Sequence, residues 1–227
     1  MKLLVTSGAT REPIDEVRFL SNVSTGRTGA QLADLLSQRG HAVTLLAGEA
    51  AVRPAGTPDV RPFSSAEDLK TKLQKLLSTG AFDAVIMAAA VADYRPAEFT
   101  AGKLSSDADG LTIRCVRNPK ILPQLKAFSP RPLAVVGFKL TVGADATARH
   151  AAVSAQFATG GVDAVVQNDL AEIHAAAAGA HPFRLFTAAH TEPQPVAGVS
   201  ALALELERIL SRLGTDQAGR MSLEGEQ

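Results

Sequence analysis

Short runs of Val, Ile, Leu and Ala alternate along the chain with segments whose apolar residues recur at helical spacing. The first run, at residues 3–5, is followed by a helical pattern over 31–39. The alternation continues, with strands expected at 42–47, 83–89, 133–138 and 163–167 and helices at 65–78, 119–127 and 144–159. Continuously apolar strands that alternate with helices are typical of a mostly parallel sheet covered on both faces. The pattern therefore predicts a doubly wound, Rossmann-like α/β fold.

Three segments depart from this alternation. Residues 93–118 hold a polar loop followed by a period-two pattern over 111–117, which predicts a half-exposed antiparallel strand that could protrude as an arm. Residues 171–180 are mostly alanine and could form a helix or a mobile loop. An amphipathic helix is expected over 199–213, and the polar residues 214–227 are expected to form a disordered tail.

Composition narrows the class of protein. Hydrophobic residues make up 46% of the chain and charged residues 20%, as in ordinary globular proteins, and the length suits one domain over 1–213. Lys plus Arg and Asp plus Glu number 23 each, so no net positive field favours nucleic acid as a partner. No apolar run approaches the roughly 20 residues that span a bilayer, so we expect a cytoplasmic protein with no membrane partner. The single cysteine, Cys115, cannot form an intramolecular disulfide, and its apolar surroundings predict a buried structural thiol.

The loop after the first strand is suited to binding phosphate. Its last residues, STGRTG at 24–29, open a helix, where glycines allow close backbone approach and the helix N-terminus offers free N–H groups. Arg18 and Asn22 lie in the same loop. The spacing matches neither a P-loop nor the usual dinucleotide fingerprint, and a capped glycine-rich turn is the alternative. We interpret the loop as the phosphate-binding entrance of a nucleotide-using enzyme.

Further candidates follow later strands, where open α/β sheets bind ligands. Ala89 and Ala90 leave room for a ligand against the backbone, and Asp93 could hold Mg²⁺ or a ligand hydroxyl, or cap a turn. Phe138 could stack on a base or belong to the core. Asn168 could bind a base or a ribose, or cap a turn.

Taken alone, the remaining residues give little support for a further charged site, a zinc site or covalent catalysis. Lys103, in the segment GKLSS, would be an exposed cation if taken alone. The five histidines show no metal-binding spacing, so no zinc site is expected. No serine occupies a nucleophile elbow and Cys115 has no obvious base, so covalent catalysis is unsupported.

Six blocks of sequence resemble a known family. The blocks TSGATREPIDEVRFLSNVSTGRTG, AAAVADYRP, GKLSS, RNPKIL, VGFKL and VVQNDL occur in the same order as in phosphopantothenate–cysteine ligases, also called phosphopantothenoylcysteine synthetases, of coenzyme A biosynthesis. The resemblance spans about residues 2–170. Long, ordered blocks are far more specific than a lone glycine motif.

The resemblance implies an enzyme that joins 4′-phosphopantothenate to L-cysteine with CTP or ATP and Mg²⁺. A carboxylate oxygen would attack the α-phosphate to give an acyl-nucleotidylate and pyrophosphate, and the cysteine amine would then displace the nucleoside monophosphate. By this resemblance, Lys103 would stabilise charge on the phosphates and Asn22 would position the acyl intermediate. Arg18 would contact phosphopantothenate from the neighbouring subunit.

The resemblance also implies how one pocket is shared between the ligands. Nucleotide-binding residues would be Gly8, Ser24, Gly26, Gly29, Asp93, Asn118, Pro119, Lys120, Ile121, Phe138 and Asn168. Phosphopantothenate-binding residues would be Arg18, Asn22, Ala89, Ala90 and Asp93. No metal ligand is assigned.

By the same resemblance, the arm near 110–117 contributes to a homodimer with shared active sites. Fused bacterial members carry a flavin-dependent decarboxylase ahead of this domain, whereas nothing precedes Met1 here, so we expect the ligase alone, without flavin. The basic residues that fused members bring to the triphosphate are absent near 150–160. The nucleotide therefore stays open between CTP and ATP, with CTP preferred.

Two other functions are considered. An NAD(P)-dependent Rossmann oxidoreductase would need a GxGxxG turn after the first strand and a ribose-binding residue after the second, for which AGE at 47–49 is a weak candidate. A catalytically inactive nucleotide-binding regulator is the second alternative, although Arg18, Asn22 and Lys103 are all retained.

Overall fold

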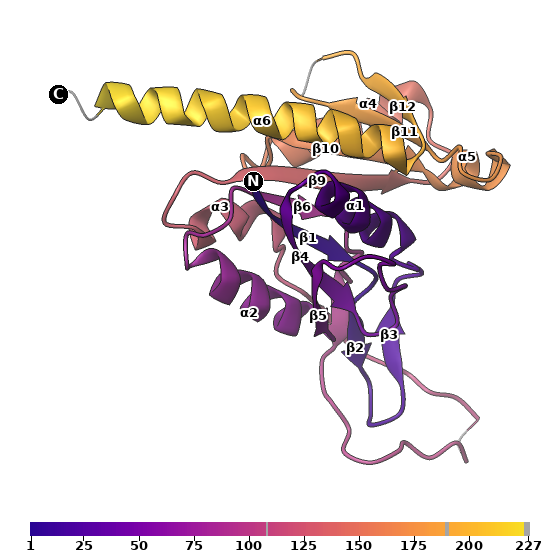
Figure 1. The fold of residues 1–227 in the computed structure, drawn as a ribbon. Coiled ribbons are helices and arrows are strands. Elements are labelled where there is room, and N and C mark those ends of the chain that lie inside the picture. The colour runs from indigo at the N-terminus through magenta and orange to yellow at the C-terminus, as the bar shows by residue number, and fades with distance from the viewer. Residues whose placement is uncertain (108, 189–190, 225–227) are drawn as a thin grey trace.

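Eight strands form one sheet in the order β12-β11-β10-β9-β6-β1-β4-β5 (Figure 1). The computed structural model describes residues 1–107, 109–188 and 191–224. The strands of the sheet are β1 Lys2–Ser7, β4 Ala42–Gly48, β5 Asp59–Phe63, β6 Ala84–Met87, β9 Ala134–Thr141, β10 Ala164–Asp169, β11 Pro182–Phe186 and β12 Gln194–Ala197. The pairs β10–β11 and β11–β12 are antiparallel and the other pairs are parallel. The predicted doubly wound, mostly parallel sheet is confirmed.

The direction of winding reverses between β1 and β6. From β1 the chain proceeds outward to β4 and β5, and it then returns to β6 on the other side of β1 before reaching β9 and β10. Val5 of β1 is paired with Leu45 on one side and Ile86 on the other. In such sheets the ligand crevice lies outside the carboxyl ends of the strands at this reversal. The topology therefore sets where a site can form.

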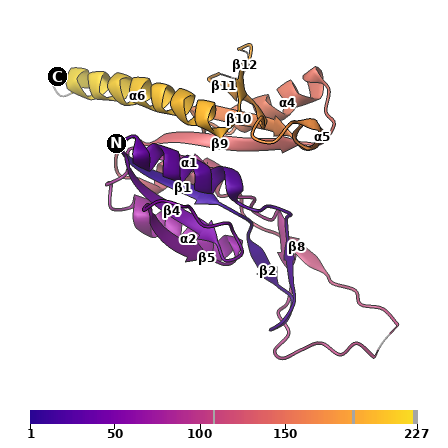
Figure 2. The same ribbon diagram turned by 45° about the vertical axis from the view of Figure 1, so that its right-hand side comes forward.

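Helices cover both faces of the sheet (Figures 1 and 2). They are α1 Arg27–Gln38, α2 Ala66–Leu77, α3 Leu125–Phe128, α4 Ala146–Phe157, α5 Leu170–Ala175 and α6 Val199–Glu224, with a 3-10 turn, η1, at Leu122–Gln124. α1 and α6 pack on one face, where Leu32 and Leu206 are fully buried. α2, α3 and α4 cover the other, where Leu69 and Val153 are fully buried. None of the helices in the described part of the chain is both long and apolar enough to cross a membrane.

Two small antiparallel hairpins project from the sheet. β2 (Arg11–Pro13) pairs with β3 (Phe19–Ser21), and β7 (Tyr94–Pro96) pairs with β8 (Cys115–Arg117). The loop between β7 and β8 extends away from the sheet in both views (Figures 1 and 2). We call residues 94–117 the arm.

One expectation for the arm holds only in part and another is wrong. The strand expected over 111–117 is limited to β8, because its partner β7 offers only three residues for pairing. Cys115 is exposed, not buried, because most residues of this two-stranded ladder face solvent and no second layer covers it.

Prolines explain most of the elements that the sequence did not predict correctly. β5, β11 and β12 each contain a proline, which interrupts the apolar pattern but is tolerated at a sheet edge or as the first residue of a strand. The helix expected over 119–127 is replaced by η1 and the four-residue α3, since Pro123 lies in the first turn.

The C-terminal helix is longer than expected. α6 continues to Glu224, where we expected a tail from residue 214. One glycine, Gly214, costs a helix only about 1 kcal/mol relative to alanine, which the flanking helix formers offset. The alanine-rich segment 171–180 divides, because α5 ends at Ala175 and the following five residues are not helical.

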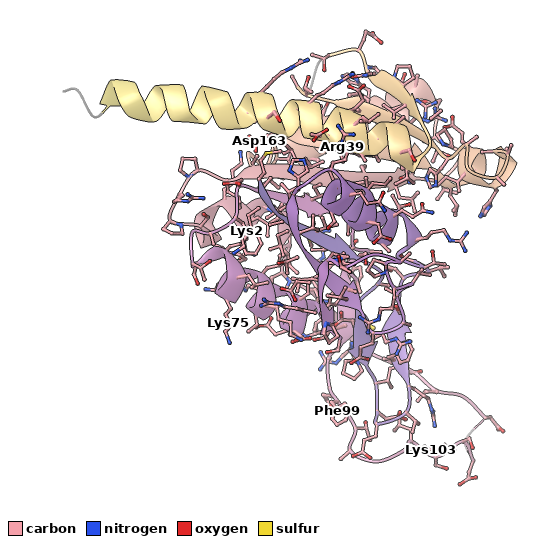
Figure 3. The ribbon with its side chains drawn as sticks, viewed as in Figure 1. Lys2, Arg39, Lys75, Phe99, Lys103 and Asp163 are labelled. Carbon is pink, nitrogen blue, oxygen red and sulfur yellow. The ribbon has the colours of Figure 1, made fainter. Side chains whose placement is uncertain are left out.

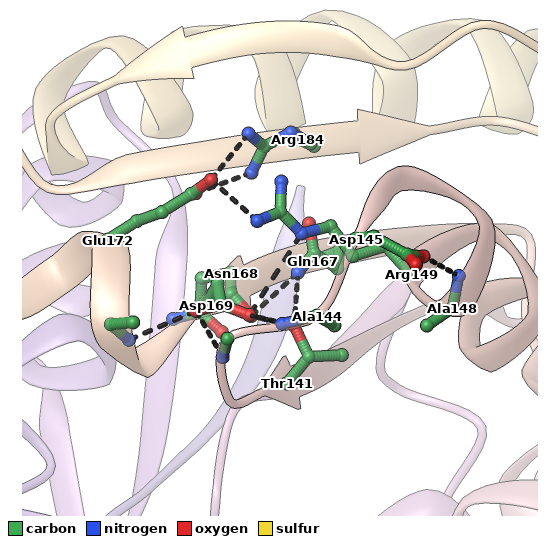
Figure 4. Close-up of polar contacts among 12 residues, drawn as sticks. Thr141, Ala144, Asp145, Ala148, Arg149, Gln167, Asn168, Asp169, Glu172 and Arg184 are labelled. Carbon is green, nitrogen blue, oxygen red and sulfur yellow. Dashed lines mark hydrogen bonds and ion pairs between the residues drawn. The ribbon is translucent and has the colours of Figure 1, made fainter.

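A buried polar network joins the carboxyl ends of β9 and β10 (Figure 4). Asp169 is fully buried and accepts hydrogen bonds from the Thr141 hydroxyl at 2.6 Å and the Gly143 N–H at 2.9 Å. The N–H groups of Ala144 and Ala171 also donate to it, at 3.1 and 3.0 Å. The Thr141 hydrogen bond is the largest cause of a pKa for Asp169 well below its ordinary value, and with the backbone donors it outweighs burial.

Glu172 of α5 extends the network to α4 and β11. Its carboxylate accepts two hydrogen bonds from Arg184, at 2.7 and 3.0 Å, and pairs with Arg149 at 2.8 Å. The Arg184 hydrogen bond is the main cause of the lowered pKa of Glu172. The network thus fixes β10, α4, α5 and β11 relative to one another.

α1 begins very close to β1. A Cβ atom on Gly29 would lie 2.5 Å from the Ser7 Cβ and 3.0 Å from the Thr6 carbonyl oxygen. Gly26, which precedes the helix, has a φ of +73°, and a Cβ atom there would lie 2.8 Å from the Gly8 nitrogen. Glycine is therefore required at both positions for the helix to start against the strand.

The G29A variant is expected to lose about 1–3 kcal/mol of unfolding free energy, the usual cost of an overpacked core. Urea unfolding measures this loss. Gly110→Ala is the matched control, because a Cβ atom there meets nothing within 4 Å. Equal stability of G29A and the wild type would contradict the close contact between α1 and β1.

The pH dependence of stability tests the network at Asp169. Because folding lowers the pKa of Asp169, its charge stabilises the protein above about pH 4, and this contribution is lost as pH falls toward the folded-state value. At pH 7, D169N should unfold at a lower urea concentration than the wild type, and the difference should shrink at about pH 3. The exposed Asp107→Asn is the control. A difference that does not change with pH would rule out this role.

Candidate functional site

A cavity of about 760 Å³ lies where the winding of the sheet reverses. Its walls come from the loop that leads into α1, the loop after β6, the segment before η1, and the ends of β9 and β10. Ligand pockets for small molecules usually have volumes of roughly 300–1,000 Å³. The cavity therefore has both the position and the size expected of a ligand site.

The amino end of α1 forms one wall. Gly26 and the first residues of the helix line the cavity, and no side chain caps the helix. The first N–H groups of a helix have no partner within it and carry a positive partial charge, so this wall is suited to an anion. Ser24 lines the same wall. Gly8 does not line the cavity but lies beneath Gly26 and lets the loop pack closely.

The loop after β6 forms the floor. Its backbone is held against β1, because the Ala89 N–H donates to the Thr6 hydroxyl at 3.0 Å and the Ala90 N–H to the Gly8 carbonyl at 2.8 Å. The Asn22 side-chain amide donates to the Val91 carbonyl at 3.3 Å. The small side chains predicted to leave room for a ligand thus lie beside Asn22.

Asp93 brings the segment 118–121 into the site. Lys120 pairs with the Asp93 carboxylate at 2.5 Å, and the Asn118 N–H donates to the Asp93 carbonyl at 2.8 Å. The Asp93 and Lys120 side chains are 63% and 72% exposed, and ion pairs this exposed contribute little stability. A charged ligand could therefore replace either partner at small cost.

Phe138, Asn168 and His181 form the far wall. The Asn168 amide nitrogen lies 3.1 Å from Nε2 of His181, whose ring stacks on Phe183 with 4.2 Å between centroids. Burial lowers the pKa of His181, so this imidazole is neutral at pH 7. Sequence reasoning missed His181, because only the antiparallel return of β11 brings it beside β10.

The charges of the cavity favour an anionic ligand. Arg27, Lys120 and Lys139 line it against one carboxylate, Asp93. Within residues 1–107, 109–188 and 191–224, no three His, Cys, Asp or Glu side chains lie close enough together to hold a metal ion. Mg²⁺ is usually held by one or two carboxylates together with phosphate oxygens. Asp93 therefore fits a Mg²⁺ ion that arrives on a phosphorylated ligand.

Most of the predicted site residues meet in this cavity. Those that line it are Asn22, Ser24, Gly26, Gly29, Ala89, Ala90, Asp93, Asn118, Pro119, Lys120, Ile121, Phe138 and Asn168. Arg18 and Lys103 do not line it, and Lys103 lies exposed near the far end of the arm (Figure 3).

Arg18 is bound to the arm. Its Nη2 donates to the Leu104 carbonyl at 2.5 Å and its Nε lies 3.4 Å from Oδ2 of Asp15. Burial raises the pKa of Asp15, but N–H donors from Val17, Leu104 and Arg18, followed by the charge of Arg18, more than offset this and lower it. Sequence reasoning also missed Asp15, since its role depends on a contact between segments far apart in the chain.

Comparison with known proteins matches nearly the whole chain to one protein family. Residues 1–210 match the family described as DNA/pantothenate metabolism flavoprotein C-terminal domain. The chain is 43% identical over 150 residues to the coenzyme A biosynthesis bifunctional protein CoaBC of Mycobacterium tuberculosis, a match that covers 63% of this chain and 35% of that protein. The chain thus spans about a third of the length of the curated relatives it matches.

Solved structures extend the similarity to the fold. The DNA/pantothenate metabolism flavoprotein from Streptococcus pneumoniae superposes with a TM-score of 0.82 at 26% identity, covering 93% of this chain and 99% of that one. The C-terminal domain of a CoaBC protein gives a TM-score of 0.73 at 25% identity, covering 93% and 95%. With its sheet, its cavity and this match over 210 residues, the chain belongs to the family of the DNA/pantothenate metabolism flavoprotein C-terminal domain.

Proposed function

We propose that this chain joins 4′-phosphopantothenate to L-cysteine in coenzyme A biosynthesis, with CTP or ATP as the energy source. The observation that carries the proposal is the cavity at the amino end of α1, lined by three cations and one carboxylate. A cavity of this kind suits a triphosphate together with a second phosphorylated substrate. The relatives named for coenzyme A biosynthesis add independent support.

The proposed reaction has two steps because a free carboxylate is a poor acylating agent. The carboxylate of phosphopantothenate attacks the α-phosphate of the nucleotide, so that an acyl-nucleotidylate forms and pyrophosphate leaves. The amine of cysteine then attacks the acyl carbon and releases the nucleoside monophosphate. Both steps need the reacting groups to be held close together, which one shared cavity can provide.

The walls of the cavity suggest how the ligands divide it. We propose that the nucleotide lies along the amino end of α1 and the wall of Phe138 and Asn168, while phosphopantothenate lies over Ala89 and Ala90 beside Asn22. Mg²⁺ held by Asp93 would neutralise phosphate charge. Neutral His181 would keep the Asn168 amide in place against the nucleotide.

We further propose that two copies of the chain form a homodimer in which Arg18, and Lys103 beside it on the arm, reach the partner's cavity. Support comes from the position of Arg18 outside the cavity of its own chain. Exposed apolar side chains gather on the β2–β3 hairpin and the arm and could be covered by a second copy: Val17, Phe19, Tyr94, Phe99 and Leu111, which are 45–58% exposed.

The activity is tested by incubating the protein with phosphopantothenate, Mg²⁺ and either CTP or ATP, with and without cysteine, and measuring pyrophosphate. Release should require phosphopantothenate, and the amide product should also require cysteine. The preferred nucleotide is the one that supports faster release. No release with either nucleotide would refute the ligase, and nucleotide binding without release would indicate an inactive regulator.

Two variants should separate the steps. Lys103→Gln should slow pyrophosphate release about 100-fold, the usual effect of losing one group that stabilises transition-state charge. Asn22→Ala should still release pyrophosphate in a first burst but should accumulate the acyl-nucleotidylate, because the amine is no longer aligned. Lys75→Gln, an exposed lysine on α2, is the control (Figure 3). A normal burst in K103Q or normal turnover in N22A would show that the role is wrongly assigned.

A further inference from the structure

Asp15, in the turn between β2 and β3, connects this turn to the arm. Its side chain is fully buried, and Oδ1 accepts hydrogen bonds from the N–H groups of Val17 at 2.9 Å and Arg18 at 2.7 Å. Oδ2 accepts the Leu104 N–H at 3.1 Å and lies 3.4 Å from Nε of Arg18. One carboxylate thus contacts both Arg18 and the residue next to Lys103.

The backbone of the arm follows the same turn on both sides of Lys103. The Glu16 N–H donates to the Gly102 carbonyl at 3.1 Å, and the Thr100 N–H donates to the Ile14 carbonyl at 3.0 Å. On the other side of Lys103, the Leu104 carbonyl accepts from Arg18 at 2.5 Å. Gly102 and Leu104 are therefore both held by the turn, although the Lys103 side chain itself is exposed.

We propose that Asp15 is a positioning residue that makes Arg18 and Lys103 a single unit. The inference rests on the proposed function, which uses both cations. Fixing a backbone residue costs conformational entropy, and the hydrogen bonds of Asp15 offset this cost before any ligand binds. Two cations held in a fixed relation can meet a phosphorylated substrate and a leaving phosphate together, which raises the rate through orientation.

The primary variant is Asp15→Asn, which keeps the shape but turns one acceptor into an N–H₂ group facing a donor. Its pyrophosphate release should fall roughly 10- to 100-fold, with a raised KM for phosphopantothenate because Arg18 also loses its partner. The matched control is Asp163→Asn (Figure 3). The Asp163 carboxylate likewise accepts one hydrogen bond from a backbone N–H, that of Val135 at 2.8 Å, and one from a cation, Lys126 at 2.7 Å. Asp163 lies at the amino end of β10. D163N should release pyrophosphate within about twofold of the wild type.

A double-mutant cycle separates positioning from general destabilisation. If Asp15 acts through Lys103, D15N should slow the K103Q enzyme much less than it slows the wild type. If the two effects simply multiply, Asp15 does not act through Lys103 and the proposal is overturned.

Amide hydrogen exchange gives a readout that does not depend on activity. In D15N, the Leu104 and Glu16 amides should exchange at least tenfold faster than in the wild type, whereas D163N should leave them unchanged. If D15N does not fold, Leu104→Pro provides the same test. This variant removes the N–H that donates to Asp15, in a segment outside both hydrophobic cores, and it should likewise speed exchange at the Glu16 amide. Unchanged exchange at Glu16 would overturn the proposal. A wild-type protein that releases no pyrophosphate would instead refute the ligase function, while hydrogen exchange would still report on the contact between Asp15 and the arm.

Discussion

Where α1 begins, its first turn lies so close to β1 that the backbone at Gly29 leaves no room for a side chain. The amino end of the helix is thereby held at the reversal point of the sheet, where its first residues line the cavity. Gly26 and Gly8 permit the same approach from the preceding loop. If this contact were wider, the helix end would move away from the loop after β6, and one ligand could not touch both walls.

The cavity combines rigid walls with a readily displaced ion pair. Its floor is held to β1 by backbone hydrogen bonds, and the far wall is backed by the network around Asp169 and Glu172. Between them, Asp93 and Lys120 pair in an exposed position. Rigid walls keep a bound ligand in one orientation. In the exposed ion pair, an incoming phosphate can replace the carboxylate, or an incoming cation the lysine, without the large penalty of breaking a buried pair.

The sequence predicts those parts of the molecule in which local pattern and tertiary structure agree. The parallel strands are continuously apolar because both of their faces are buried, and their loops carry Asn22, Asp93 and Asn168 to one side of the sheet as expected. Edge strands with proline lack such a pattern. His181 and Asp15 were missed for a different reason: each acquires its partner only through long-range pairing, β10 with β11 for the first and the β2–β3 turn with the arm for the second.

The exposure of Cys115 has a practical consequence. It is the only cysteine in the chain, and it lies on β8 at the base of the arm. A maleimide dye or a nitroxide would attach at this one position without any engineered thiol. Fluorescence anisotropy or electron spin resonance could then follow the arm directly, in the unaltered sequence, as each ligand is added.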